Sequence, residues 1–258
     1  MPRTLCVIPA RMASGRFPGK PLKPLLGLAL VLHVYERCKL ASGLDRIVIA
    51  TCDEDIRAAC EAHGAEAVMT ADTHPGCVDR TEEAVQKFAP EFNDDDFILM
   101  VQGDEVLVSP DMLEDVIDVY AKTKAEVVNI ASRLYRTVDH DDPNAVKVIW
   151  APDGRALAFS RAPIPSRARS AEGAYLMYQQ TGIIGFARGF LRTFGKLPQT
   201  PLEKIEKIDM LRTLEHGYSV RIVATEKETI GVDTPNDLAR AEGVLREDPW
   251  TAGYLKDL

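Results

Sequence analysis

The chain has 258 residues and a mass of 28.5 kDa, and its 46% hydrophobic and 27% charged residues are typical of a globular protein with a large buried core. The 39 acidic residues outnumber the 31 Lys and Arg residues, and the resulting net charge of −8 argues against a nucleic-acid partner held by overall charge. The five cysteines form no C-x-x-C pair, and no apolar run is long enough for a signal peptide or a membrane span. We therefore expect a cytoplasmic protein with no membrane partner.

Short apolar runs alternate with longer amphipathic segments, which is the pattern of a mostly parallel β-sheet with crossover helices. The predicted strands cover residues 5–8, 47–50, 97–101, 127–131, 145–149 and 220–224. The predicted helices cover residues 31–40, 53–62, 80–88, 110–121 and 235–245. Ser109 followed by Pro110 is a typical helix start, because serine caps a helix and proline in the first position loses no needed N–H.

The second half of the chain has a different pattern. Residues 139–143 are acidic and loop-like, and Pro152-Asp153-Gly154 is a hairpin signal. We interpret residues 145–190 as an antiparallel insertion on the sheet. No linker, repeat or low-complexity tract divides the chain, so a single domain over residues 1–258 is the simplest account, with residues 248–258 as a loosely packed tail.

A basic loop follows the first predicted strand, and its sequence over residues 8–22 is IPARMASGRFPGKPL. Arg11, Arg16 and Lys20 lie beside two glycines at the strand end, where an open α/β sheet places its ligand crevice. Cations and backbone N–H groups in such a loop are suited to a triphosphate. The loop is not a Walker A motif, because Pro21 follows Lys20 where serine or threonine would bind magnesium. A basic surface loop without a ligand is the alternative.

Two aspartates lie at the ends of other predicted elements. Asp104 follows the strand at 97–101, and Asp233 precedes the last helix. Carboxylates at such a strand end are suitable ligands for Mg²⁺, which prefers oxygen and bridges to substrate phosphates. Each aspartate alone is compatible with a helix cap or a turn. Together with the basic loop they predict a metal–triphosphate site with Mg²⁺ as the cofactor.

Six segments in chain order carry a family resemblance: IPARMASGRFPGKPL, IVIATCDEDI, VQGDE, PNAVKV, FSRAPIP and GVDTPNDL. Across essentially the whole chain they resemble the 3-deoxy-manno-octulosonate cytidylyltransferases, also called CMP-KDO synthetases. The resemblance implies a Rossmann-like GT-A nucleotidyltransferase fold of the α/β class, usually a homodimer, with the acceptor and dimer region in residues 145–190. It also implies an enzyme of lipopolysaccharide biosynthesis that joins CMP from CTP to the hydroxyl of an acidic sugar and releases pyrophosphate with Mg²⁺.

The resemblance also implies roles for individual residues. The expected catalytic residues are Lys20, Arg11, Asp104 and Asp233, and the two aspartates are the expected metal ligands. The expected nucleotide-binding residues are Ala10, Arg11, Arg16, Lys20, Asp79, Arg80 and Gln102. The expected acceptor-binding residues are Arg161, Gln180, Ile184, Asp209 and Met210. Arg161 is the candidate contact for the acid group of the acceptor.

Several positions depart from the family where it contacts its sugar. The family pattern R-H-x-G-I-Y-G-Y is QQTGIIGF here, so that Gln180 replaces histidine and Ile184 replaces tyrosine. The pattern P-L-E-x-x-E-x-L-E-Q-L-R has Asp209 in place of glutamate and Met210 in place of glutamine, and methionine cannot donate to a hydroxyl. In the pattern H-x-S-G-T-E-R, Val78 removes a hydroxyl near the nucleotide. Lost polar groups change which acceptor a pocket selects.

Alternatives therefore remain open at this point. The same CTP chemistry acts on KDO through compensating residues such as Arg167, Arg169 and Tyr175, or on a smaller keto acid or a phosphonate. A non-catalytic nucleotide-binding protein with the same fold is a second alternative. A nucleotidyltransferase for another base is a third, because readout of a base by backbone groups leaves little trace in a sequence.

Overall fold

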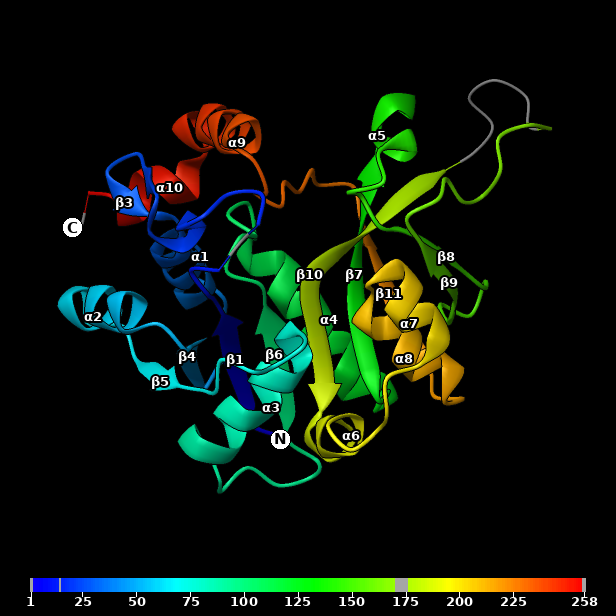
Figure 1. Cartoon of the computed structure of the whole chain (residues 1–258), viewed down its shortest axis with the longest axis horizontal. Helices are drawn as coiled ribbons and strands as arrows, with labels where there is room; N and C mark the ends of the chain where they lie inside the picture. The colour runs from blue at the N-terminus through cyan, green and yellow to red at the C-terminus, as the bar shows by residue number, and fades with distance from the viewer. Residues whose placement is uncertain (1, 14, 170–175, 257–258) are drawn as a thin grey trace.

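A mixed β-sheet forms the centre of the molecule, with helices on both faces (Figure 1). The computed structural model describes residues 2–13, 15–169 and 176–256. The strands of the sheet are β1 (Thr4–Pro9), β4 (Arg46–Thr51), β5 (Ala67–Met69), β6 (Phe97–Val101), β7 (Val127–Leu134), β8 (Lys147–Trp150), β9 (Ala156–Ser160), β10 (Met177–Ala187) and β11 (Val220–Thr225). The strands β2 (Pro24–Leu25) and β3 (Leu28–Ala29) form a separate small ribbon.

The helices lie between and after these strands. They are η1 (Lys20–Leu22), α1 (Leu30–Lys39), α2 (Glu54–His63), α3 (Cys77–Phe88), α4 (Pro110–Thr123), α5 (Thr137–Asp141), α6 (Arg188–Phe194), α7 (Pro201–Glu206), α8 (Asp209–Glu215), α9 (Pro235–Glu247) and α10 (Pro249–Tyr254). All the predicted helices are present. Thr234 caps α9 by accepting a hydrogen bond from the backbone N–H of Asp237.

The main path of the sheet follows the strand order β11-β7-β10-β6-β1-β4-β5. Its strands run parallel to one another except β10, which pairs antiparallel with both β6 and β7. The strands β8 and β9 form an antiparallel hairpin that joins the sheet through β10. The prediction of a mostly parallel α/β sheet with antiparallel strands in the second half is confirmed.

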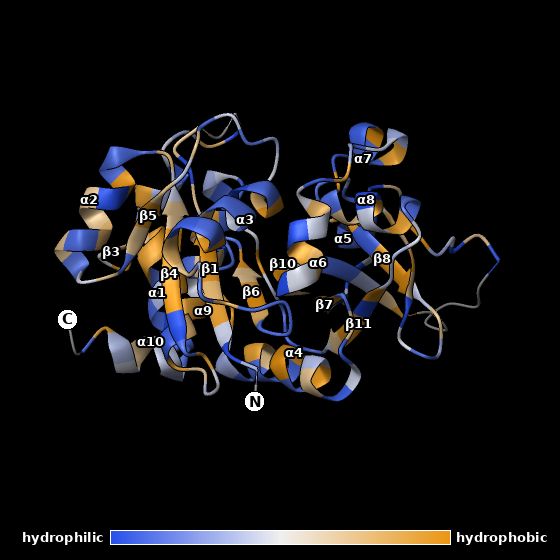
Figure 2. Ribbon diagram, turned by 90° about the horizontal axis from the view of Figure 1, so that it is seen from below, coloured by the Kyte–Doolittle hydropathy of each residue, from blue (hydrophilic) through white to orange (hydrophobic). Residues whose placement is uncertain are grey.

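Each face of the sheet carries its own hydrophobic core. Along β1, Cys6 and Ile8 point into the core beneath α1, α4 and α9, whereas Leu5 and Val7 point into the core beneath α3, α6 and α8. A strand covered on both faces needs a continuous run of apolar residues rather than an alternating pattern. The central strands in Figure 2 are coloured as hydrophobic for this reason.

The strand β10 differs most from its prediction. All six predicted strands are present, but the prediction lacks β2, β3, β5 and β10, and it treats residues 145–190 as an antiparallel insertion on the sheet. Instead β10 lies inside the main sheet, with Ile184 opposite Met100 of β6 and Asn129 of β7. The predicted hairpin is formed by β8 and β9, which turn at Gly154 with a φ of 87° and join the sheet at β10.

The C-terminal residues pack against the rest of the protein, so the prediction of a loose tail is wrong for residues 248–256. The Tyr254 side chain is buried, and its hydroxyl lies 2.7 Å from Nδ1 of His33 on α1. Asp248 forms an ion pair of 2.6 Å with the buried Arg37. Residues 257–258 lie outside the described part of the chain. Among the described residues, no helix has the length and apolar character needed to cross a membrane.

The direction of the strands places many polar segments at one edge of the sheet. The carboxyl ends of β1 and β6 lie there because these strands are parallel neighbours. The amino-terminal half of β10 reaches the same edge because this strand runs in the opposite direction, with Ile183 beside Val101 at the end of β6. The edge therefore combines loops that follow parallel strands with residues of a rigid strand.

Candidate active site

A cavity of about 1160 Å³ opens at this edge of the sheet. Its wall includes the loop after β1, the turn after β6, the amino-terminal half of β10 and the segment before α9. The predicted site residues in this wall are Arg11, Arg16, Gln102, Asp104, Arg161, Gln180, Ile184, Asp209 and Asp233. Segments that are far apart in the sequence thus contribute to one cavity.

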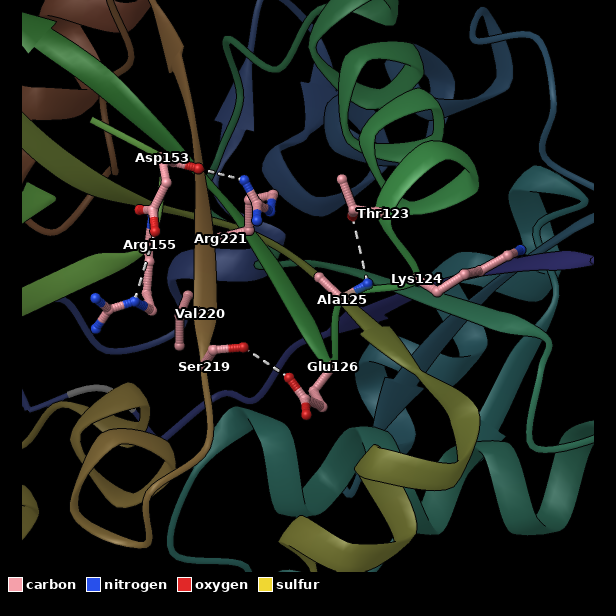
Figure 3. Close-up of a pocket in the computed structure, with 9 residues that line it drawn as sticks. All are labelled: Thr123, Lys124, Ala125, Glu126, Asp153, Arg155, Ser219, Val220 and Arg221. Atoms are coloured by element: carbon pink, nitrogen blue, oxygen red, sulfur yellow. Dashed lines mark hydrogen bonds and ion pairs between the residues drawn. The ribbon is translucent and has the colours of Figure 1, made fainter. Parts of the chain in front are cut away.

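A second pocket, of about 240 Å³, lies near the amino ends of β7 and β11, at the opposite edge of the sheet (Figure 3). Ser219 Oγ donates to a Glu126 carboxylate oxygen at 2.7 Å, and Arg221 donates to the Asp153 carbonyl at 2.5 Å. Because these polar groups bond to one another, the pocket is a weaker candidate than the large cavity.

The two predicted metal ligands lie on either side of one lysine. Lys20 Nζ is 2.7 Å from Oδ2 of Asp104 and 3.1 Å from Oδ1 of Asp233. Burial disfavours the charged form of Lys20, but the neighbouring carboxylates outweigh this effect and raise the pKa of the ammonium above its ordinary value. Because both carboxylate oxygens reach one nitrogen atom, they are close enough together to share a cation.

The backbone brings these aspartates together. The N–H of Val232 donates to the Asp104 carbonyl at 3.2 Å, and Gly231 forms an antiparallel bridge with Glu105. These contacts hold the segment that carries Asp233 against the turn that carries Asp104. The sequence predicted both aspartates but not this bridge, because it is a contact between distant segments outside any long strand.

The donor set fits Mg²⁺. Magnesium prefers hard oxygen ligands and is usually held by one or two carboxylates together with water and substrate phosphates. Asp104 and Asp233 offer this number of carboxylates. Among the described residues, no group of three or more His, Cys, Asp and Glu side chains offers a larger protein cage.

Two further cations of the basic loop line the cavity. One nitrogen of the Arg16 guanidinium lies 2.7 Å from Oδ2 of Asp233, and another donates to Oδ1 of Asn144 at 2.5 Å. Arg11 makes no hydrogen bond or ion pair with any other residue that the structure describes. Asn144 lies in the PNAVKV motif but is not a predicted site residue, and its link to the basic loop is visible only in the fold.

Glu105 is a functional candidate that is not among the predicted site residues. One of its carboxylate oxygens accepts the N–H of Gly182 on β10 at 2.5 Å, and the other is buried without a partner among the described residues. Burial, and then the charge of Asp104, raises the pKa of Glu105 to about 7. A Cβ at Gly182 would lie only 2.8 Å from the Gln102 side chain, so glycine permits this close approach. An acid directly before the apolar run VLV was the available sequence signal.

The other end of the cavity contains the positions that depart from the family. Ile184 and Met100 give this end an apolar wall, and Gln180 donates to the Asn129 side chain at 2.8 Å. Asp209 lies beside Gly76 at the amino end of α3, where a Cβ on the glycine would come within 2.7 Å of the carboxylate. Burial, and then the charge of Asp79, raises the pKa of Asp209 to about 6.

Some predicted contact residues lie behind the cavity wall. Met210 is fully buried in the core, so the structure places it away from any acceptor. Asp79 forms an ion pair of 3.2 Å with Arg212, and the buried Arg80 donates to the Thr70 hydroxyl. Ala10 is also buried, and its N–H donates to the Ala50 carbonyl. These residues support the wall, and Gly76 and Cys77 line the cavity where Asp79 and Arg80 had been expected.

Arg161 lies in the cavity wall with its guanidinium already engaged. It donates to the backbone carbonyls of Glu206 at 2.6 Å and Pro143 at 2.9 Å. Among the suggested compensating residues, Arg167 forms an ion pair with Asp141, Arg169 is exposed, and Tyr175 lies outside the described residues. An acidic acceptor would therefore meet Arg161 as part of a fixed loop.

An α/β sheet with a basic loop and paired carboxylates at its carboxyl edge defines a nucleotide-binding class of protein. A family model described as "Cytidylyltransferase" matches residues 5–229. The chain belongs to this cytidylyltransferase family. The matched region ends before Asp233. The backbone bridge between Gly231 and Glu105 places Asp233 beside Asp104 in the site.

Two relatives agree with this assignment over nearly their whole length. The chain is 39% identical to the 3-deoxy-manno-octulosonate cytidylyltransferase of Thermodesulfovibrio yellowstonii over 249 residues, which covers 94% of this chain and 98% of the relative. It is 37% identical to the 8-amino-3,8-dideoxy-manno-octulosonate cytidylyltransferase of a Shewanella species, with coverage of 94% and 98%. The resemblance that the six motifs predicted is confirmed.

A solved structure supports the fold. CMP:2-keto-3-deoxy-manno-octonic acid synthetase complexed with CTP superposes with a TM-score of 0.86 and 30% sequence identity, over 95% of this chain and 99% of that chain. The predicted nucleotidyltransferase fold is confirmed.

Proposed function

We propose that this protein transfers the cytidylyl group of CTP to a hydroxyl of an acidic sugar, either KDO or a related 3-deoxy sugar acid, and releases pyrophosphate with Mg²⁺ as its cofactor. The observation that carries the proposal is the contact of one ammonium group, that of Lys20, with both Asp104 and Asp233, two aspartates that line the large cavity. The family membership and the relatives support CTP and a sugar acid as the substrates.

The residues of the cavity suit in-line transfer of a phosphoryl group. The oxygen of the acceptor hydroxyl attacks the α-phosphorus, the bond between that phosphorus and the oxygen leading to the β-phosphate breaks, and the hydroxyl proton passes to solvent. Arg11, Arg16 and Lys20 contact the phosphates and stabilise the charge on the leaving pyrophosphate. Asp104 and Asp233 would hold Mg²⁺, which supplies further positive charge when it is bound. No side chain forms a covalent intermediate.

The acceptor end of the cavity positions the sugar acid for this attack. Gln180 and Asp209 offer polar groups, and Ile184 offers an apolar surface. Holding the hydroxyl in line with the α-phosphorus provides much of the rate enhancement in such reactions. The apolar contact at Ile184 favours, as a second candidate, the same chemistry on a smaller or less hydroxylated keto acid or on a phosphonate.

A pyrophosphate-release screen tests the proposal. Each of the four nucleoside triphosphates is combined with KDO, its 8-amino analogue, other 2-keto-3-deoxy acids, sialic-type acids and phosphonates, with Mg²⁺ present. We expect release with CTP and a 3-deoxy sugar acid together, and the CMP-sugar as product by mass spectrometry. Tight CTP binding without pyrophosphate release from any acid would instead support a non-catalytic nucleotide-binding protein.

We also propose a homodimer in the cytoplasm. Ile205 on α7 is 76% exposed and Leu157 on β9 is 54% exposed, and Ser160 at the end of β9 donates to Glu206 at the end of α7. Large apolar side chains exposed on neighbouring elements favour an interface over a fully solvated surface. The five unpaired cysteines support a reducing compartment. Sedimentation of the wild type and of Ile205→Glu tests the dimer, because the variant should sediment as a monomer.

A further inference from the structure

The cations of the basic loop contact the same oxygen atoms that a metal ion would need. Lys20 Nζ lies within 3.1 Å of one oxygen of each aspartate, and the Arg16 guanidinium lies 2.7 Å from the second oxygen of Asp233. The Lys20 side chain is only 11% exposed, and those of Asp104 and Asp233 are 22% and 31% exposed. Charges in such partly buried positions interact more strongly than charges in water.

A metal ion that binds alone therefore meets a cost. It must displace Lys20 from both carboxylates and Arg16 from Asp233, and the released cations would then lie beside a divalent cation. A nucleotide that binds alone meets the opposite cost. It would draw Lys20 and Arg16 to its phosphates and leave two carboxylates facing a polyanion.

The two costs cancel when both ligands bind. The metal replaces the cations on the carboxylates, and the phosphates replace the carboxylates on the cations. The exchange needs no movement of the fold, because lysine has a flexible stem with three rotatable donors and the Arg16 side chain is 52% exposed.

We propose that, in the absence of ligands, Lys20 and Arg16 occupy the carboxylate oxygens of Asp104 and Asp233 that a metal ion would bind. The site therefore binds the metal and the nucleoside triphosphate together, and it binds either one alone only weakly. The proposal rests on the proposed function, because it takes Asp104 and Asp233 as the metal ligands and the loop cations as the phosphate ligands. Linkage then requires that each ligand increases the affinity of the other by the same factor.

Calorimetry of the full-length protein tests this coupling without turnover. Mg²⁺ alone, CTP alone with a chelator, and CTP with Mg²⁺ are titrated separately, and Mn²⁺ followed by its electron paramagnetic resonance signal provides a second probe of metal binding. In the wild type we expect the affinity for the metal to be at least about tenfold higher with CTP than without it, after correction for the complex in solution.

The decisive variant is Lys20→Met, which keeps the length of the side chain and removes its charge. We expect the affinity for Mn²⁺ alone to increase about tenfold, because no cation competes for the carboxylates, and the affinity for CTP with Mg²⁺ to decrease about tenfold. A residue that acts only through the phosphates would change the second affinity and not the first. Lys122→Met is the matched control, because Lys122 is exposed on α4 and its side chain is absent from the wall of the cavity.

A second variant covers the case in which Lys20→Met does not fold, as judged by circular dichroism. Arg16→Met removes a more exposed cation from one oxygen of Asp233, and we expect the same directions of change with smaller size. If the affinity for Mn²⁺ alone is unchanged or lower in the folded variants, the proposal is wrong. This result is distinct from failure of the proposed function, which the absence of any CMP-sugar product would show.

Discussion

The two ends of the large cavity are built differently. At the nucleotide end, Lys20 and Arg16 pair with aspartates from other segments, and these charged groups lie on turns, loops and the short helix η1 rather than on a strand. At the acceptor end, Gln180 and Ile184 lie on the rigid strand β10. If the proposed function is right, phosphate and metal chemistry depends on a few charges, whereas the choice of acceptor depends largely on the shape and polarity of residues on β10.

The largest expected effect comes from the nucleotide end. Asp104→Asn removes the charge that a metal ion requires, and we expect turnover in the pyrophosphate assay to decrease at least about a hundredfold. Asp118→Asn is the control, because this aspartate is exposed on α4. Wild-type turnover by a folded Asp104→Asn protein would show that the Asp104 carboxylate does not hold a metal ion that the reaction needs.

The next effect concerns the stability of the acceptor end. The pKa of Asp209 is raised from 3.8 to about 6, chiefly by burial, so the folded protein binds a proton more tightly than the unfolded chain between these values. Asp209 therefore lowers stability as the pH rises from about 4 to 6, and the penalty is complete above pH 6. We expect Asp209→Asn to raise the free energy of unfolding by about 2 kcal/mol at pH 8 and by little at pH 4.

Urea unfolding at the two pH values measures this difference. Asp118→Asn again serves as the control, because its side chain is 69% exposed. An equal gain in stability at pH 4 and pH 8 would contradict a penalty that arises from ionisation of Asp209.

A smaller effect, on the KM of one substrate and not of the other, should distinguish the acceptor end of the cavity from the nucleotide end. Gln180→His restores the polar group that the family pattern has at this position. We expect the KM for KDO to decrease about fivefold, the gain of roughly one hydrogen bond, while the KM for CTP stays unchanged. A change in the KM for CTP of similar size would mean that β10 does not serve the acceptor alone.

The smallest effect lies outside both ends. Tyr254→Phe removes the hydroxyl that bonds to His33 beneath α10, and we expect the free energy of unfolding to decrease by about 1 kcal/mol. Neither KM should change. Altered steady-state kinetics in this variant would connect the C-terminal helix to the cavity.

Charged motifs at strand ends were predictable from the sequence because their chemistry depends on residue type. The residues Lys20, Asp104 and Asp233 lie together as their types suggested. Burial was not predictable in the same way. Met210 belongs to a family motif, yet it faces the core, because a short helix turns only some of its residues toward the cavity.

The antiparallel direction of β10 could not be predicted from the sequence for a related reason. A central strand buried on both faces has the same apolar pattern whether it runs parallel or antiparallel to its neighbours. Its partners β6 and β7 are distant in sequence, so local patterns carry no information about the pairing. The contact between Asn144 and Arg16 was hidden in the same way, because it joins two loops across the cavity.

The reversed strand β10 has a consequence for engineering this protein. Because its amino-terminal half supplies Gln180 and Ile184 from a hydrogen-bonded sheet, point substitutions there leave the lengths and connections of the loops around the nucleotide intact. A library confined to these strand positions would explore new acceptors while the cytidylyl donor site stays as it is. If the proposed function is right, donor and acceptor recognition can be varied separately within a single sheet.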